Sequence, residues 1–483
     1  MNKKIRIVSL ILAASVALAG CSMTGEETAA SSDSSASGED LYSDRDYETD
    51  YDTDEAQYIE LDGEGLTITS EGTYVISGAI DDGQLLIDAG EEDKIQLVLD
   101  GVDITSYDSA AIYILSADKV FITTEEGSVN HLTNTAGFAE DADSNEDAVI
   151  FSKADLTLNG EGTLIVSSAD NGITSKDDLV ITGGTYEIEC QGHALQGKDL
   201  IAIADGVFDL TSGEDAIHGK NSDDAALGDV TINGGSFTIT AGDDAVHSES
   251  DLLITDCSMN ILSCEEGLEG NTVTITGGDI VINSKDDAIN AAGSSASEFA
   301  EDASAYIDIS GGTIDITCSG DGIDSNGSLT VSGGFITISG PDNGGNGSMD
   351  YNGSAEITGG TMIACGINGM AQNFTEAGQG SILIATELQQ AGTKVMLSDK
   401  DGNEILSFEP GMSYSSILIS SPELKQGETY VITAGTDTYE ITLEDLICGQ
   451  TEGMGGAMPE GSMPNGGGMP GGRMGDQRPQ MPG

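Results

Sequence analysis

Positive charge is what this chain of 483 residues lacks most. It has 16 Lys and Arg residues against 84 Asp and Glu residues, which gives a formal net charge of −68. A protein of this charge repels polyphosphate, so nucleic acid is excluded as a partner. The expected counterpart is a cation, provided that the carboxylates gather closely enough to hold one.

Arginine and aromatic residues are scarce as well. The four arginines stand at positions 6, 45, 473 and 478, outside the repeat region described below, which excludes proton abstraction by an arginine base. There is no Trp, and aromatic residues make up 5% of the chain. Flat aromatic platforms for a neutral glucan are therefore few.

Long hydrophobic runs are absent apart from residues 7–18. This run follows Lys3, Lys4 and Arg6, precedes "LAGC" at 18–21, and is too short to cross a bilayer. Its ending resembles a bacterial lipobox, whose cysteine is lipidated and becomes the mature N-terminus. We expect a signal peptide at 1–20 and a lipid anchor at Cys21, which would hold the protein on the outer surface of a bacterial membrane.

Composition divides the rest of the chain. Residues 21–57 are rich in Ser, Asp, Glu and Tyr, and residues 448–483 in Gly, Met and Pro, so we expect a disordered acidic tether and a disordered tail. Alternating apolar and polar residues fill the interval 58–447. From residue 381 their spacing changes to that of hairpins, which predicts a small antiparallel β unit at 381–447.

The interval 58–380 carries a repeat of about 22 residues, as in "DLVITGGTYEIEC" at 178–190 and "DVTINGGSFTITA" at 229–241. Short strands joined by tight turns, without helical periodicity, predict an all-β right-handed parallel β-helix with rungs of this length. Alternation places Leu179, Ile181, Tyr186, Ile188, Val230, Ile232, Phe237 and Ile239 inside. The cysteines form no C-x-x-C pair, so those after Cys21 are expected as buried thiols.

Paired acidic residues recur in this repeat, in "GEDAIHG" at 213–219, "GDDAVHS" at 242–248, "CEEGLEG" at 264–270 and "KDDAINA" at 285–291. Equivalent positions on successive rungs lie ~4.8 Å apart, so the pairs stack into two rows. The first acidic row contains Glu214, Asp243, Glu265 and Asp286. The second acidic row contains Asp147, Asn171, His193, Asp215, Asp244, Glu266, Asp287, Asp321 and Asn343.

Two carboxylates at this spacing repel by ~0.9 kcal/mol in water and by more near a protein surface. Ca²⁺ takes six to eight oxygen ligands and can bridge carboxylates of neighbouring rungs. We therefore expect calcium as the bound cofactor, with ligands from Glu214, Asp215, Asp243, Asp244, Glu265, Glu266, Asp286, Asp287 and Asp321. The alternative is ordinary turn chemistry, which explains a single Asp or Asn per turn but explains the pairs poorly.

A third row contains His218 and His247, followed by Glu269, Asn290 and Asp324. These histidines suit a transition metal, a general base, or outward-facing polar positions without a ligand. Lysines 176, 198, 220 and 285 also lie near the acidic turns, either as bases or as ion pairs with the adjacent Asp177, Asp199 or Asp286. We expect a ligand to contact His218, His247, Lys220 and Asp324.

Several motifs resemble the carbohydrate-binding β-helix family of clostridial and related surface lipoproteins. They are "GTYVISG" at 72–78, "IQLVLDGVDI" at 95–104, "NGITSKDDLVITGGT" at 171–185 and "SSILISSPELKQGETYVIT" at 415–433, and the likeness spans roughly residues 60–445. The resemblance implies a pectate-lyase-like fold, bound calcium, and non-catalytic binding of cellulose-like or acidic plant polysaccharides such as polygalacturonate. Calcium on Asp243, Asp244, Asp286 and Asp287 would then accept a uronate carboxylate.

Two other functions stay open at this point. The first is a calcium-dependent pectate lyase that uses a lysine as its base. The second is a calcium-stiffened surface stalk or adhesin whose ligand is a protein partner.

Overall fold

The computed structural model describes residues 41–138, 145–221, 223–293 and 301–449. The chain divides into Met1–Leu41 and Tyr42–Gly483, and the fold described here belongs to the second unit. The signal peptide, Cys21, residues 21–40 of the expected tether and most of the expected tail lie outside the described residues. Among the residues described, no helix is long and apolar enough to cross a bilayer.

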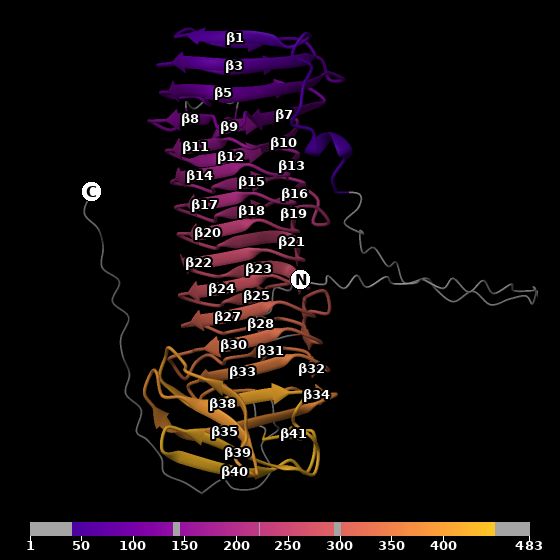
Figure 1. The fold of residues 1–483 in the computed structure, drawn as a ribbon, viewed down its shortest axis with the longest axis vertical. Coiled ribbons are helices and arrows are strands. Elements are labelled where there is room, and N and C mark those ends of the chain that lie inside the picture. The colour runs from indigo at the N-terminus through magenta and orange to yellow at the C-terminus, as the bar shows by residue number, and fades with distance from the viewer. Residues whose placement is uncertain (1–40, 139–144, 222, 294–300, 450–483) are drawn as a thin grey trace, which may run out of the picture. The chain divides into compact units, whose positions relative to one another are not determined.

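The described chain is all-β, with one sheet of 37 strands, a second sheet of four strands, and a single 3-10 helix, η1 (Asp44–Tyr47). Nearly all pairings within the large sheet are parallel, and in the rungs without an insertion each strand pairs with its equivalent about 22 residues later. The arrangement is consistent with a β-helix-like solenoid, whose successive rungs are stacked in Figure 1. We call residues 57–377 the stack.

Three columns of strands form the regular part of the stack. Column A contains β9 (Ala148–Ser152), β12 (Asn171–Ser175), β15 (Leu195–Gly197), β18 (Ile217–Gly219), β21 (Val246–Ile254), β23 (Leu268–Ile275), β25 (Ile289–Ala291), β28 (Asp324–Ser325) and β31 (Asp350–Tyr351). Column B contains β10 (Asp155–Gly160), β13 (Asp178–Ile181), β16 (Leu200–Ile203), β19 (Asp229–Ile232), the second halves of β21 and β23, β26 (Tyr306–Ile309), β29 (Ser328–Val331), β32 (Ala355–Ile357) and β34 (Glu376–Ala377). Column C contains β11 (Thr163–Ser168), β14 (Thr185–Cys190), β17 (Val207–Thr211), β20 (Ser236–Thr240), β22 (Ser258–Cys264), β24 (Asp279–Ser284), β27 (Thr313–Cys318), β30 (Phe335–Ser339) and β33 (Thr361–Gly366).

The first rungs are longer and less regular. They contain β1 (Gln57–Asp62), β2 (Leu66–Ile68), β3 (Gly72–Ile80), β4 (Leu85–Asp88), β5 (Lys94–Ser106), β6 (Ile112–Ser116), β7 (Lys119–Thr124) and β8 (Val129–Asn134). β1, β3 and β5 pair in parallel, and β5 pairs with both β7 and β8. The long strand β5 thus pairs with the two strands, β7 and β8, on which columns B and C are stacked.

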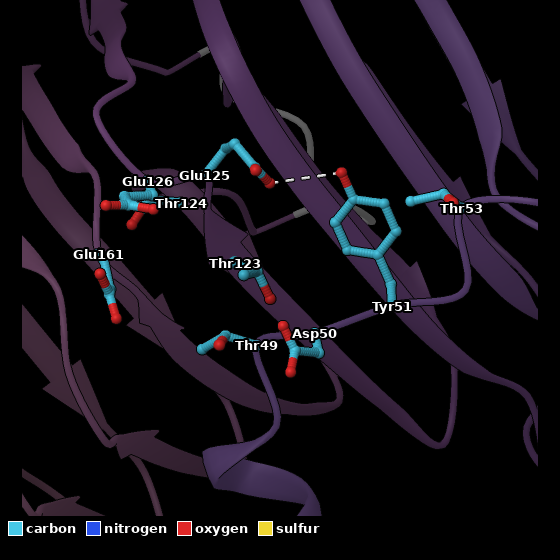
Figure 2. A pocket seen from close by; sticks show the side chains of 9 residues that line it. All are labelled: Thr49, Asp50, Tyr51, Thr53, Thr123, Thr124, Glu125, Glu126 and Glu161. Carbon is cyan, nitrogen blue, oxygen red and sulfur yellow. Dashed lines mark hydrogen bonds between the residues drawn. The ribbon is translucent and has the colours of Figure 1, made fainter.

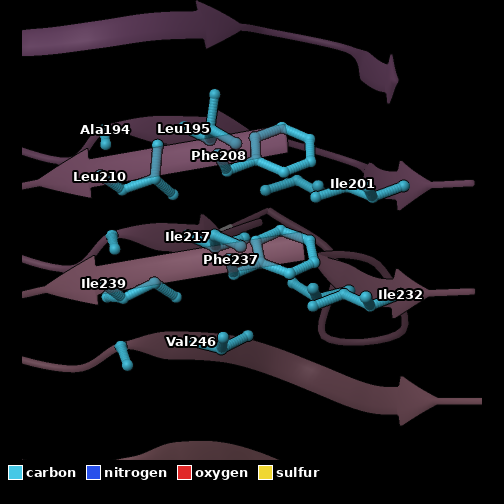
Figure 3. Packing of buried hydrophobic residues seen from close by; sticks show 14 of the residues in the cluster. Ala194, Leu195, Ile201, Phe208, Leu210, Ile217, Ile232, Phe237, Ile239 and Val246 are labelled. Atoms are coloured by element: carbon cyan, nitrogen blue, oxygen red, sulfur yellow. The ribbon is translucent and has the colours of Figure 1, made fainter. Parts of the chain in front are cut away.

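Equivalent apolar side chains stack on one another inside the rungs. Figure 3 shows Leu195, Ile217 and Val246 in one such line, with Phe208 and Phe237 in another. The two phenyl rings lie parallel with centroids 4.6 Å apart. All eight residues that alternation places inside are at most 2% exposed, which confirms those predictions. Full burial of each such side chain contributes about 1.5–3 kcal/mol.

The Gly-Gly pairs lie in the turns between columns B and C. Gly235 has φ +101°, and a Cβ there would lie 3.1 Å from the Gly206 carbonyl oxygen and from the Phe237 ring. This turn therefore needs both the left-handed backbone and the missing side chain.

Antiparallel pairing begins near the C-terminus. β38 (Tyr414–Ser421) pairs antiparallel with β33 and with β35 (Gly380–Gln389), and β41 (Ile447–Cys448) joins β35. β36 (Val395–Asp399), β37 (Glu404–Phe408), β39 (Thr429–Ala434) and β40 (Asp437–Thr442) form the separate four-stranded sheet, whose apolar residues cluster with those of β33, β35 and β38. Five of the six described cysteines are buried and all six are free thiols.

The expected disorder of the tether is wrong for its described C-terminal part. Residues 42–49, which we call the strap, were expected to belong to a disordered tether, but they pack against the outside of column B. Lys119 Nζ lies 2.8 Å from Asp46 Oδ1, and the Asp46 side chain is 2% exposed. Thr182 Oγ1 donates to the Asp46 carbonyl oxygen at 2.6 Å, and the Arg45 guanidinium lies 4.4 Å from the centroid of the Phe121 ring. Polar partners on the stack, rather than hydrophobic burial, order this segment.

Candidate cation and ligand site

The outward-facing side chains of column A form a surface that we call the charged face. Strand register places Gln196, His218, His247, Glu269, Asn290, Asp324 and Asp350 opposite one another on successive rungs. This confirms that His218, His247, Glu269, Asn290 and Asp324 share one row. Gln196 and Asp350 extend it and were missed by the sequence reasoning.

The second acidic row ends differently from its expected alignment. Gly322 N donates to the Gly347 carbonyl oxygen, in the same pattern in which Ala288 N donates to Asp321. Gly347 therefore follows Asp321 in this row, and the assignment of Asn343 is wrong. A longer, glycine-rich turn between β30 and β31 shifts the register, and this shift also hid Asp350.

Side chains of the second acidic row bind the backbone of the next rung. Asp244 N donates to Asp215 Oδ1 at 3.0 Å, and Asp321 N donates to Asp287 Oδ1 at 2.6 Å. Gly347 N donates in the same way to Asp321. Each of these aspartates uses one oxygen in this ladder, and its second oxygen is left for another partner.

The first acidic row points outward. Glu214, Asp243, Glu265 and Asp286 are all exposed. Glu214 Oε2 lies 3.1 Å from His193 Nε2, and Glu265 Oε2 lies 3.5 Å from Lys285 Nζ. None of the four belongs to a group of three potential metal ligands among the described residues. The structure thus separates the two members of every acidic pair.

Second-row acids instead meet residues three positions later in the chain. Ligand atoms of Asp287, Asp321 and Asp324 lie within 4.8 Å of one another, and so do those of Asp244, Glu266 and Glu269. The pattern that could have revealed this contact is the spacing of Asp or Glu and the third-row residue in "DAIH", "DAVH", "EGLE", "DAIN" and "DGID". Adjacent residues of an extended segment face apart, whereas the turn brings positions i and i+3 together.

The cluster of Asp287, Asp321 and Asp324 has the oxygen ligands that calcium requires. Ca²⁺ binds oxygen at 2.3–2.6 Å, so ligands on opposite sides of an ion lie up to about 5 Å apart. The Asp287, Asp321 and Asp324 separations fall within that limit. Asn290, 8% exposed and adjacent in the third row, has an Oδ1 atom without a hydrogen-bond partner among the described residues. Three converging carboxylates and an unpartnered amide oxygen on the neighbouring rung fit a hard cation.

The carboxyl groups of this cluster bind protons more tightly than ordinary carboxyl groups do. Burial first, and then repulsion by neighbouring carboxylates, raises the pKa of Asp287 to about 6, of Asp324 to about 7 and of Asp321 to about 8. The same causes raise the pKa of Glu266 to about 8. At pH 7 Asp321 and Glu266 therefore hold protons that a divalent cation would displace, Asp324 holds one in about half of the molecules, and Asp287 is mostly ionised.

His247 supplies a positive charge of the protein's own. Its Nδ1 lies 2.9 Å from Asp244 Oδ2 and 3.1 Å from Glu269 Oε2. Burial opposes the charged imidazole, but these two carboxyl groups outweigh it and raise the pKa of His247 to about 10. His218 differs, because burial outweighs its bond with Asp215 and lowers its pKa.

Lysines occupy the N-terminal rungs of the charged face. Lys176, Lys198 and Lys220 line a cavity of 220 Å³ together with Ser175 and Gln196. Their ion pairs reach Asp147 at 2.6 Å, Asp223 at 2.9 Å and Glu249 at 3.6 Å. These partners lie on other rungs or loops, so the lysines do form ion pairs, but with other acids than the adjacent aspartates of that alternative. The charged face runs from lysines through histidines to carboxylates.

A second cavity lies between the strap region and β7. It measures 270 Å³, and Figure 2 shows the acidic side chains Asp50, Glu125, Glu126 and Glu161 around it. Tyr51 Oη donates to Glu125 Oε2 at 3.4 Å. Its nine lining residues include no Lys, Arg or His. No repeat spacing in the sequence indicated this cavity.

Comparison with known proteins gives three findings. The profile of a family described as "Carbohydrate-binding domain-containing protein" matches residues 62–299 and 263–440. A protein of Acetivibrio thermocellus with the same description is 38% identical over 191 residues, which are 38% of this chain and 65% of that protein. The chain thus spans just under two thirds of that relative. A solved structure described as the polysaccharide lyase-like protein from C. thermocellum, gadolinium derivative, is 35% identical, covers 47% of this chain and 92% of that chain, and has a TM-score of 0.38.

Proposed function

Since the chain belongs to the family of carbohydrate-binding domain-containing proteins, we propose that it is a calcium-dependent, non-catalytic polysaccharide-binding lipoprotein of the cell surface. We propose a right-handed parallel β-helix as its scaffold and the charged face as its ligand surface. The lipid anchor at Cys21 would hold it on the outer side of the bacterial membrane.

One observation carries the proposal. Ligand atoms of Asp287, Asp321 and Asp324 converge, and Asn290, the strand neighbour of Asp324, has an unpartnered Oδ1. Asp287 and Asp321 each have one oxygen bound to the backbone and one remaining. Such oxygens suit calcium, which combines carboxylate and amide oxygen ligands and usually completes its shell with water.

The coordination positions of calcium that the protein leaves to water are available to the polysaccharide. A uronate carboxylate can replace water on the ion, which would let a protein of charge −68 bind an anionic polymer. The lysine rungs favour the same ligand, because Lys198 and Lys220 present the opposite charge on the same face. An acidic polysaccharide such as polygalacturonate is therefore favoured over cellulose.

Lyase chemistry with an arginine base would need an arginine on the charged face, and the described part of that face has none. Arg45, the arginine within the described residues, lies on the strap outside column B and donates to Gln96 Oε1 at 3.0 Å. Lys220 remains a candidate base for a lyase, and the Lys220→Ala variant in the next paragraph tests that role.

Retention on insoluble polygalacturonate and on cellulose, with calcium and with chelator, tests the proposal. We expect calcium-dependent retention on polygalacturonate, and equal retention with chelator would refute calcium bridging. Lys198→Gln with Lys220→Gln should weaken retention, whereas Lys400→Gln, an exposed lysine of the C-terminal unit, should not. Absorbance of unsaturated uronides that disappears in Lys220→Ala would replace the proposal with lyase activity.

A further inference from the structure

Two histidines and an aspartate meet in the middle of the charged face, between the lysine rungs and the carboxylate cluster. Ligand atoms of His193, Asp215 and His218 all lie within 4.8 Å of one another. His193 belongs to the second acidic row, Asp215 follows it in that row, and His218 begins the histidine part of the third row. The three side chains therefore come from two successive rungs.

The separations of their atoms are those of metal ligands. His193 Nδ1 lies 3.2 Å from His218 Nδ1 and 3.3 Å from Asp215 Oδ2. Ligands held at about 2.0–2.1 Å from a tetrahedral zinc ion lie roughly 3.3 Å from one another. Only the contact between His218 Nδ1 and Asp215 Oδ2 is closer, because a hydrogen bond now joins them. A metal ion would take the place of that proton.

The neighbours of the trio prepare it for an ion. Asp215 N donates to His193 Nδ1 at 3.2 Å, so this nitrogen carries a lone pair, which a bound ion would take over from the backbone amide. The ring proton of His193 is then on Nε2, which lies 3.1 Å from Glu214 Oε2. A carboxylate on the far nitrogen of a histidine is the usual second partner of a metal-binding imidazole, which it orients and makes more basic. Exposed Glu214 thus acquires a role that turn chemistry does not explain.

The surroundings of His218 hold its ring beside the other two ligands. Its side chain is 7% exposed, and the ring is packed between His193, with centroids 4.1 Å apart, and His247, at 5.0 Å. Its Nδ1 faces His193 and Asp215, whereas Nε2, on the opposite side of the ring, has no hydrogen-bond partner among the described residues. Nε2 can therefore carry the ring proton when Nδ1 binds an ion.

We propose that His193, Asp215 and His218 form a binding site for a borderline transition metal such as Zn²⁺, Ni²⁺ or Co²⁺, separate from the calcium cluster. Two imidazole nitrogens with one carboxylate oxygen select such ions over calcium, which takes oxygen ligands. Three protein ligands leave a coordination position for water or an anionic oxygen. His193 is 14% exposed, so an ion reaches the site from solvent.

Titration with Co²⁺ and Zn²⁺ in the presence of saturating calcium tests the site on the whole chain. We expect the visible absorption of four-coordinate Co²⁺ and its displacement by Zn²⁺ at one equivalent. His193→Asn and His218→Asn should each weaken Zn²⁺ binding by at least about 100-fold. Glu214→Gln, which changes an exposed side chain and leaves folding unaffected, should weaken it by about 10-fold.

His131→Asn is the matched control, because His131 is an exposed histidine of β8 that lies outside the trio and outside column A. It should leave Zn²⁺ affinity within about threefold, and circular dichroism should show that every variant is folded. Equal Zn²⁺ binding by His193→Asn, Glu214→Gln and the unmodified protein would overturn the proposal, as would loss of binding in His131→Asn alone. Calcium-dependent polysaccharide retention is measured separately, so failure of either proposal leaves the other standing.

Discussion

Asp321→Asn should stabilise the folded protein when calcium is absent and destabilise it when calcium is bound. Asparagine retains an Oδ1 atom that accepts from Gly347 N, so the backbone ladder is preserved. What changes is the ability to carry a negative charge next to Asp287 and Asp324. The substitution therefore isolates the electrostatic part of the calcium account.

The magnitude follows from proton linkage. The pKa of Asp321 rises from 3.8 to about 8 in the folded protein, so at pH 7 folding without calcium must retain a proton that the unfolded chain releases. A difference of about three pH units corresponds to roughly 4 kcal/mol as an upper bound. Because neighbouring carboxyl groups share this cost, we expect Asp321→Asn to stabilise the calcium-free protein by about 2 kcal/mol.

With calcium bound, the unmodified protein should be more stable than Asp321→Asn. The ion stabilises the folded state in proportion to its affinity, and the variant offers one charged ligand fewer. Urea or thermal unfolding at pH 7, in chelator and in calcium, measures both states. Asp286→Asn is the matched control, since Asp286 is exposed on the same rung as Asp287, and it should change stability by less than about 0.5 kcal/mol. Destabilisation by Asp321→Asn in chelator as large as in calcium would refute the reasoning.

Three further predictions concern pH, the strap and the core. Without calcium, the unfolding temperature should fall as pH rises from about 4 to about 8, because Glu266 and Asp321, with pKa values of about 8, keep protons in the folded state that the unfolded chain loses; a rise over this range would contradict the assignment. Asp46→Asn removes the buried ion pair with Lys119, so proteolysis within residues 42–49 should accelerate in line with a loss of about 3 kcal/mol in strap docking, and an unchanged cleavage rate would show that the pair does not hold the strap. Phe237→Ala should cost about 3–5 kcal/mol of stability by opening a cavity under Phe208, whereas Phe335→Ala, at a side chain 39% exposed, should cost far less; equal losses in chemical unfolding would contradict the stacked core.

Alternation within a strand is a local property, and this is why the interior of the stack was predictable. Tyr186 and Phe237 were placed inside from their own neighbours, and stacking on equivalent rungs followed from the 22-residue repeat. The shared row of His218 and His247 was predictable for the same reason. Each prediction needed only a constant register.

Features that depend on distant segments were not predictable in this way. The strap is ordered by Lys119 and Thr182, which are far away in the chain and carry no periodic mark. Asp350 was missed because a longer turn changed the register. The direction of each acidic pair depends on turn geometry, which turns Asp287 inward and leaves Asp286 exposed although both are aspartates.

Binding of soluble polygalacturonate, measured while calcium is raised from zero, tests the central claim most directly. The account predicts that affinity appears with calcium, is lost in Asp321→Asn, and is unchanged in Asp286→Asn. Calcium-independent binding, or equal binding by the two variants, would contradict it.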